Sequence, residues 1–107
     1  MTREIRVGLI GLGYIGKIHA LAYRSIGYCY TAPAVRANLV AVLRSKLGTE
    51  AEAVKAAGFD VVTTDPDEFY AQKLDIVDVC TPNYLHLEHA QRAMREGVPV
   101  YCEKPLA

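Results

Sequence analysis

Residues 11–16 read Gly-Leu-Gly-Tyr-Ile-Gly, which places three glycines in the spacing G-x-G-x-x-G. The run before them, residues 4–10, is rich in Ile, Val and Leu, as expected of a strand that is buried on both faces. The run after them, residues 14–26, has apolar residues at helical spacing and predicts a helix. A glycine loop between a buried strand and a helix is the context in which this motif binds the pyrophosphate of a dinucleotide.

Each glycine of the loop has its own expected role. Gly11 permits the tight turn, Gly13 leaves room for the pyrophosphate, and Gly16 lets the helix pack closely against the strand. The start of the helix offers unpaired N–H groups and a partial positive charge to the phosphates. The predicted cofactor-binding residues of this loop are therefore Gly11, Gly13, Tyr14, Ile15 and Gly16. The alternative is a glycine-rich turn that serves packing alone.

The rest of the chain alternates strands with helices. Further strands are expected at 39–43, 61–63, 76–80 and 98–102, and helices at 50–57, 66–72 and 85–96. Residues 27–37 show no clean periodicity and are predicted to form a loop. This alternation favours parallel strands joined by right-handed crossovers. The predicted fold class is α/β, a doubly wound parallel sheet of the Rossmann type.

The length of 107 residues suits one domain, here assigned to residues 1–107. A complete dinucleotide fold usually has a sixth strand, so we expect a fragment that is truncated after the fifth.

Local signals mark several helix ends. Asp65 stands in an N-cap position before Pro66, and Gly27 and Gly97 are expected to follow the last residues of two helices.

Composition excludes several classes of partner. Twelve basic and twelve acidic residues cancel to a formal net charge of zero, and no basic stripe suggests a nucleic acid or an anionic membrane. The apolar run at 7–12 is too short for a membrane span or a signal peptide. Cys29, Cys80 and Cys102 form neither a zinc pattern nor a disulfide framework, so a reduced, cytoplasmic location is expected.

The end of the second predicted strand bears on the identity of the dinucleotide. An acidic residue usually binds the adenosine ribose of NAD at this point, but this chain has Arg44, Ser45 and Lys46 there. An arginine can bind a 2′-phosphate through charge-assisted hydrogen bonds, and Ser45 can add one more. We therefore predict that Arg44 and Ser45 bind the cofactor and favour NADP over NAD. The alternative is a solvated basic loop that contacts no ligand.

Polar motifs follow two of the later strands, and ligands of such sheets lie beyond the carboxyl ends of the strands. Residues 81–86 read Thr-Pro-Asn-Tyr-Leu-His, and residues 103–107 read Glu-Lys-Pro-Leu-Ala. With the glycine loop, the motifs T-P-N-x-x-H and E-K-P-L-A occur in the order typical of one family. The chain resembles the N-terminal domain of the Gfo/Idh/MocA oxidoreductases over nearly its whole length.

This resemblance implies roles for individual residues. Lys104 would assist proton transfer from the substrate hydroxyl, and Glu103 would help to fix the site near the nicotinamide. The nicotinamide end of the cofactor would be lined by Thr81, Pro82 and Asn83, with His86 nearby at the start of a helix. The residues themselves leave alternatives open. In the alternative interpretation, Lys104 is an ordinary surface lysine and Asn83 is only the N-cap of the following helix.

The resemblance also implies an activity. It indicates an NAD(P)-dependent oxidoreductase that transfers a hydride to or from a sugar, cyclitol or related hydroxy substrate. A second domain, not in this chain, would bind the substrate and form a homo-oligomer, so residues 1–107 alone would bind cofactor and turn over little. A non-catalytic dinucleotide-sensing domain is the alternative. A Rossmann-type methyltransferase is disfavoured, since Leu9 and Ile10 stand where those folds usually carry an acidic residue.

The remaining histidines and cysteines are candidates for metal ligands and nucleophiles. His86 and His89 lie three residues apart without a third ligand, so no metal is predicted and a solvated or capping role is expected. His19 is expected to be structural. Cys80 and Cys102 are expected on neighbouring strands as small buried hydrophobic residues.

Overall fold

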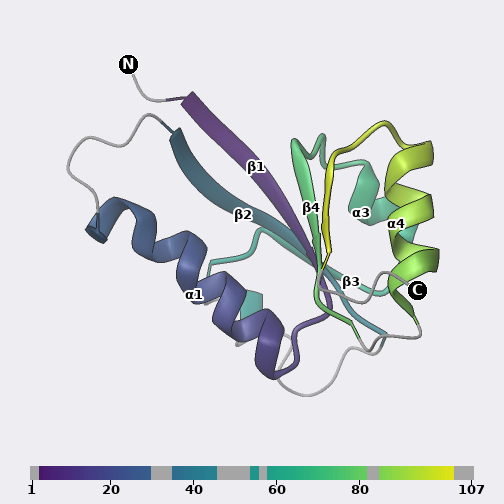
Figure 1. The fold of residues 1–107 in the computed structure, drawn as a ribbon, viewed down its shortest axis with the longest axis horizontal. Coiled ribbons are helices and arrows are strands. Elements are labelled where there is room, and N and C mark those ends of the chain that lie inside the picture. The colour runs from purple at the N-terminus through teal and green to yellow at the C-terminus, as the bar shows by residue number, and fades with distance from the viewer. Residues whose placement is uncertain (1–2, 30–34, 46–53, 56–57, 82–84, 103–107) are drawn as a thin grey trace.

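The computed structural model describes residues 3–29, 35–45, 54–55, 58–81 and 85–102. Five strands form one sheet in the order β3-β2-β1-β4-β5, and every pairing is parallel. The order changes direction between β1 and β4, the switch point of a doubly wound sheet (Figure 1). The predicted fold class is confirmed. The strands are β1 (Arg3–Ile10), β2 (Val35–Leu43), β3 (Val61–Thr63), β4 (Ile76–Val79) and β5 (Val100–Cys102).

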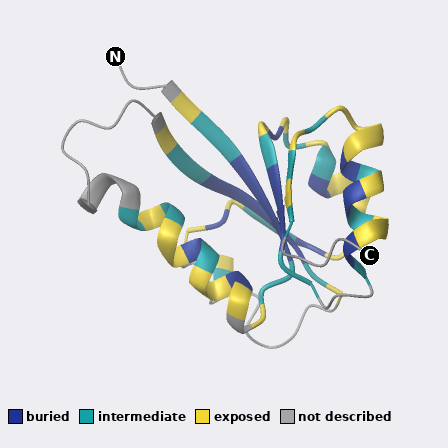
Figure 2. Cartoon of the chain, viewed as in Figure 1, coloured by how far each residue is buried: buried dark blue, intermediate teal, exposed yellow. Residues whose placement is uncertain are grey.

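The helices cover the sheet from both sides. Figure 1 shows α1 (Tyr14–Cys29) on one face, and α3 (Pro66–Tyr70) with α4 (His86–Arg95) on the other. Two apolar clusters correspond to these layers, and the buried residues gather on the central strands (Figure 2). The cluster under α1 includes Leu9 and Ala20, and the cluster under the other helices includes Phe69 and Ala93.

A β-bulge in β2 distributes apolar residues between the two faces. Val7 pairs with Leu39 but Gly8 pairs with Ala41, so Val40 is the extra residue. Leu39 consequently packs in the α1 layer, whereas Val40 and Ala41 both pack in the layer of α3 and α4. The bulge thus lets neighbouring residues of one strand fill the same layer.

The predicted loop at 27–37 is wrong at both ends. Helix α1 continues through Gly27 to Cys29, and β2 begins at Val35 instead of Leu39; residues 30–34 lie outside the described residues. A glycine inside a helix costs only about 1 kcal/mol, so tertiary packing can carry α1 past it. The first part of β2 lacked a strand signal because Arg36 is exposed there and Asn38 is half-buried, donating to Glu4.

Other predicted boundaries agree closely with the structure. Asp65 is the N-cap of α3, its carboxylate accepts the N–H of Asp67 at 3.0 Å, and Pro66 opens the helix. Gly97 follows α4 with a φ of 75°. The residue before α4 is Leu85, which makes no side-chain cap hydrogen bond, and Asn83, the residue considered for a capping role, lies outside the described residues. Of the predicted helix at 50–57, only 54–55 are described, and both are helical. Among the described helices, none is long and apolar enough to cross a bilayer.

Candidate dinucleotide-binding site

The glycine loop leaves β1 at the carboxyl edge of the sheet. Gly11 has a φ of +90°, a backbone conformation that side chains strongly disfavour, and this confirms the tight turn expected there. Its N–H donates to the carbonyl oxygen of Leu43 at 2.8 Å, which joins the end of β1 to the end of β2. A Cβ at Gly11 would also lie 3.0 Å from the carbonyl oxygen of Cys80. The turn is therefore enclosed on both sides by neighbouring strands.

The other two glycines of the loop differ in their surroundings. A Cβ at Gly16 would collide with the carbonyl oxygen of Gly11, which confirms that Gly16 is needed for close packing of α1 against the loop. A Cβ at Gly13 would have no atom within 4 Å. Gly13 is exposed and lies just before α1, which begins at Tyr14. Open space beside a helix N-terminus fits the diphosphate of a dinucleotide.

A cavity of about 640 Å³ opens at this edge of the sheet. Its size lies within the usual range for a site that binds a small organic molecule. Five of the predicted cofactor-binding residues line it together: Gly11, Gly13, Arg44, Ser45 and Thr81. The structure thus brings the ends of β1, β2 and β4 to one hollow, as a doubly wound sheet should.

The remaining predicted site residues fall into two groups: some are described but do not line this cavity, and the others lie outside the described residues. Ile15 is exposed and Gly16 is buried in the helix–loop contact, and neither borders the cavity. Tyr14 contributes its backbone at the start of α1. The residues outside the described part of the chain are Pro82, Asn83, Glu103 and Lys104.

His86 corrects one expectation. Of the two roles expected for it, solvated or capping, the solvated one is wrong, because its side chain is only 1% exposed. The Nε2 atom of His86 lies 2.7 Å from the carbonyl oxygen of Thr81. Because a carbonyl oxygen can only accept, Nε2 carries the proton and donates it. His86 thereby fixes the backbone at Thr81, which does line the cavity.

Among the residues of the cavity wall that sequence reasoning missed, four lie on later elements of the chain. Thr64 and Pro66 follow β3, while Glu88 and His89 lie in the first turns of α4. Thr64 follows a strand end, so the rule that ligands lie beyond the carboxyl ends of strands was sufficient to find it. Burial lowers the pKa of His89 below its ordinary value of 6.5; Glu88 opposes this shift and His86 adds to it.

The lowered pKa of His89 predicts a pH dependence of stability. Because the folded protein binds this proton more weakly, the unfolded chain holds more protons below pH about 6.5. The stability contributed by neutral His89 is therefore present above that pH and is lost as the pH falls through the folded-state pKa. Urea unfolding across this range should show a steeper acid loss for the native protein than for His89→Gln. Parallel curves for the two proteins would contradict this assignment.

Behind the wall of the cavity, His19 joins α1 to β4. Its Nδ1 lies 2.8 Å from a carboxylate oxygen of Asp78, and Tyr23 donates to the same oxygen at 2.9 Å. This agrees with a structural role for His19. Burial, reinforced by the adjacent carboxylate, raises the pKa of Tyr23 well above its ordinary value. Asp78 itself, a carboxylate only 1% exposed, had not been singled out from the sequence.

The cysteines agree with their predicted placement but not with full burial. Strands β4 and β5 are neighbours, with Val79 paired to Cys102, so Cys80 and Cys102 do lie close to adjacent strand ends. Both have intermediate exposure. The Sγ atom of Cys80 lies 3.2 Å from Nδ1 of His19, and its thiol donates to Asp78 at 3.3 Å. Cys80 is therefore a polar group of this site and not a simple hydrophobic residue.

Comparison with known proteins places this geometry in a family. The model of the Gfo/Idh/MocA oxidoreductase family, described by its NAD-binding Rossmann fold, matches residues 5–107. Levoglucosan dehydrogenase of Pseudarthrobacter phenanthrenivorans is 37% identical over 98% of this chain, and inositol 2-dehydrogenase of Rhizobium meliloti is 38% identical over 95%. A 2,7-anhydro-N-acetylneuraminate hydratase of Mediterraneibacter gnavus is 44% identical over 98%.

Solved structures agree with the sequence comparison. A levoglucosan dehydrogenase in complex with NADH and L-sorbose superposes with a TM-score of 0.87, at 34% identity over 99% of this chain and 29% of its own. The chain spans 27% of the length of the Pseudarthrobacter enzyme, 28% of the Rhizobium enzyme and 25% of the Mediterraneibacter enzyme.

Proposed function

Since the chain belongs to the Gfo/Idh/MocA family of oxidoreductases and forms its NAD-binding Rossmann domain, we propose that the whole protein is an NAD(P)-dependent dehydrogenase. Its substrate is a sugar, a cyclitol or a related hydroxy compound. The observation that carries the proposal is the cavity at the sheet edge, where Gly11, Gly13 and Thr81 meet beside the start of α1. Relatives named for levoglucosan and inositol support the substrate class.

The residues of this chain fit a dinucleotide. We assign the diphosphate to the loop from Gly11 to Gly16 and to the N-terminus of α1, where the helix dipole and N–H groups favour an anion. The nicotinamide end is assigned to Thr81, Pro82 and Asn83, with His86 holding the carbonyl of Thr81. When bound, the cofactor supplies the hydride chemistry. The protein positions the substrate beside the cofactor and excludes water.

The proposed catalytic residues are Lys104 and Glu103. Both follow β5, whose last residue, Cys102, lies beside β4 at the sheet edge that carries the cavity. The ammonium of Lys104 holds and moves the proton of the substrate hydroxyl, and Glu103 helps to fix the site near the nicotinamide. A general acid–base group of this kind contributes about 10²–10⁴-fold to a rate.

We further propose that the adenosine end favours NADP over NAD. Arg44 and Ser45 follow β2 and line the same cavity as the glycine loop. The N–H of Arg44 donates to the carbonyl oxygen of Thr63 at 2.9 Å, which fixes its backbone against β3. Neither residue is acidic. A carboxylate at this position would repel the 2′-phosphate of NADP, whereas the guanidinium of Arg44 can bind it.

Replacing this arginine tests the preference. Arg44→Asp should weaken NADP binding by about 1.5–3 kcal/mol, the range for a hydrogen bond to a charged group, or roughly 10- to 150-fold in Kd. NAD binding should hold or improve, because a carboxylate can accept from the ribose 2′-hydroxyl. Calorimetric titration with each dinucleotide measures both. Unchanged NADP affinity, or an equal loss of NAD affinity, would show that Arg44 does not recognise the 2′-phosphate.

The activity is tested on the whole protein. Purified enzyme is mixed with NAD or NADP and, in turn, levoglucosan, myo-inositol and methyl D-glucosides, and the absorbance of reduced nicotinamide is followed. We expect substrate-dependent reduction of the dinucleotide with at least one of them. Tight dinucleotide binding without oxidation of any sugar or cyclitol would favour the alternative, a dinucleotide-sensing domain.

The remaining assignments concern the wider setting. We propose that residues 1–107 act as one dinucleotide-binding domain, that substrate and a homo-oligomer interface belong to other parts of the protein, and that no nucleic acid or membrane takes part. The net charge of zero supports the last point. We also propose a reduced, cytoplasmic location, because the three cysteines of the sequence form neither a zinc pattern nor a disulfide framework.

A further inference from the structure

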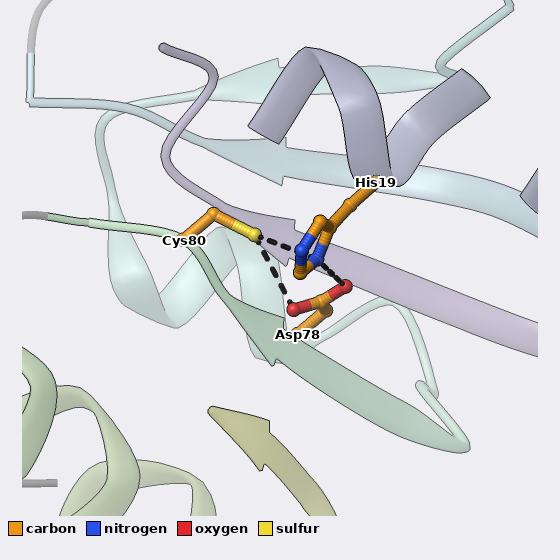
Figure 3. A group of neighbouring side chains, drawn as sticks. All are labelled: His19, Asp78 and Cys80. Atoms are coloured by element: carbon orange, nitrogen blue, oxygen red, sulfur yellow. Dashed lines mark hydrogen bonds and ion pairs between the residues drawn. The ribbon is translucent and has the colours of Figure 1, made fainter. Parts of the chain in front are cut away.

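Three side chains with different metal-binding atoms meet between α1 and β4. Figure 3 shows His19 pointing from α1 toward Asp78 and Cys80, which come from β4 and from the residue that follows it. The Nδ1 of His19 lies 2.8 Å from an Asp78 oxygen and 3.2 Å from Sγ of Cys80. The Sγ of Cys80 lies 3.3 Å from the other oxygen of Asp78. An imidazole nitrogen, a carboxylate oxygen and a sulfur thus form a tight triangle.

We propose that His19, Asp78 and Cys80 form a binding site for zinc. Nitrogen, oxygen and sulfur are the three ligand atoms that Zn²⁺ accepts in proteins, whereas a thiol disfavours Mg²⁺ and Ca²⁺. At ordinary zinc bond lengths and tetrahedral angles, such ligand atoms lie about 3.3–3.6 Å apart. The observed separations of 2.8, 3.2 and 3.3 Å match the lower limit of this range or lie up to about half an ångström below it. Small side-chain movements therefore convert the hydrogen-bonded triangle into a coordination triangle.

The charges of the site favour a divalent ion. Asp78 is a buried carboxylate, and buried charges in proteins are paired or coordinate metals. With Cys80 as thiolate and Asp78 as carboxylate, one Zn²⁺ gives a net charge of zero. Binding releases the thiol proton to solvent and requires His19 to be neutral, with its proton on Nε2 and its Nδ1 lone pair toward the metal.

The surroundings hold the ligands in place and leave a way in. Tyr23 donates to Asp78, and the ring of Tyr101 contacts His19 edge-on at 5.8 Å between centroids. Outer contacts of this kind fix the orientation of metal ligands. The side chain of His19 is 16% exposed, so water can reach the site and provide a fourth ligand. Cys80 also lines the dinucleotide cavity, which places the ion directly behind that cavity's wall.

The test uses the reduced, metal-free protein and the metals themselves. Equilibrium dialysis against Zn²⁺ should give one ion per chain, and Co²⁺ should give the charge-transfer absorption of a cobalt–thiolate bond. Cys80→Ser should abolish this band. Cys80→Ser and His19→Gln should each lower zinc affinity by at least roughly 100-fold, because outer-shell changes already cost ~10–100-fold.

Matched controls separate this site from other thiols and imidazoles. Cys102→Ser removes the cysteine at the end of β5, and His89→Gln removes a half-buried histidine of α4; both should keep the ion and the cobalt band. Thermal unfolding shows whether each variant folds, and if Cys80→Ser does not, His19→Gln decides. The proposal is overturned if zinc binds at less than one ion per chain at micromolar concentration. It is equally overturned if Cys102→Ser removes the band, or if Cys80→Ser and His19→Gln both retain the ion.

Discussion

Replacing Gly13 with aspartate is expected to abolish dinucleotide binding while leaving the fold intact. A Cβ at this position meets no atom within 4 Å, and Gly13 is not among the described residues with positive φ, so the side chain fits without strain. The added carboxylate, however, stands where we assign the diphosphate. Two unit charges 4 Å apart repel by about 4 kcal/mol at an effective dielectric constant of 20, or roughly a thousandfold in Kd.

Calorimetric titration with NAD and NADP measures this loss, and urea unfolding measures stability. Gly13→Asn is the matched control, because it has nearly the same volume without the charge. We expect Gly13→Asn to lose less affinity than Gly13→Asp and both to unfold at about the same urea concentration as the native protein. Full dinucleotide affinity in Gly13→Asp would show that the diphosphate binds elsewhere and would remove the basis of the proposed function.

The second large effect is expected at Lys104. In the whole protein, Lys104→Ala should lower kcat by about 10²–10⁴-fold, because the substrate hydroxyl loses its acid–base partner. Dinucleotide affinity should hardly change, because the diphosphate and adenosine contacts lie on other residues. Steady-state kinetics with the substrate found in the activity screen, together with dinucleotide titration, separates the two quantities.

Two controls sharpen this result. Lys55→Ala removes an exposed lysine and should leave kcat unchanged. Small primary amines added to Lys104→Ala should restore part of the rate if the missing group acts through its proton, and bulkier amines should restore less. If kcat of Lys104→Ala stays within a factor of about three of the native value, Lys104 is an ordinary surface lysine and not the acid–base group.

The sequence predicted best those features that depend on neighbouring residues. The glycine loop at 11–16 lies within one turn and the start of one helix, so its spacing, together with the buried strand before it and the helix after it, indicated Gly11 for the turn and Gly16 for packing. The doubly wound parallel sheet followed from the alternation of strands and helices and from the handedness of their connections, which leave few possible topologies. The cap at Asp65 was found for the same reason.

Features that depend on distant residues were missed. Asp78 appears in an Ile-Val-Asp-Val strand, and nothing nearby shows that His19 and Tyr23 of α1 come to meet it. The prediction of no metal rested on spacing along the chain, which cannot show that residues 19, 78 and 80 meet, and the zinc titration proposed above tests it. The burial of His86 could not be foreseen, because its partner is the backbone carbonyl of Thr81 and a backbone acceptor leaves no signal in the sequence.

The position of β1 in the middle of the sheet has a consequence for how the chain is made. One side of β1 pairs with β2, but the other pairs with β4, so that Val7 lies opposite Ile76. As the chain leaves the ribosome, this second edge stays uncovered until the residues of β4 have followed. Strand edges that wait for distant partners fold slowly and can pair with other chains. Nascent chains of this protein should therefore depend on chaperones until the residues of β4 have been made.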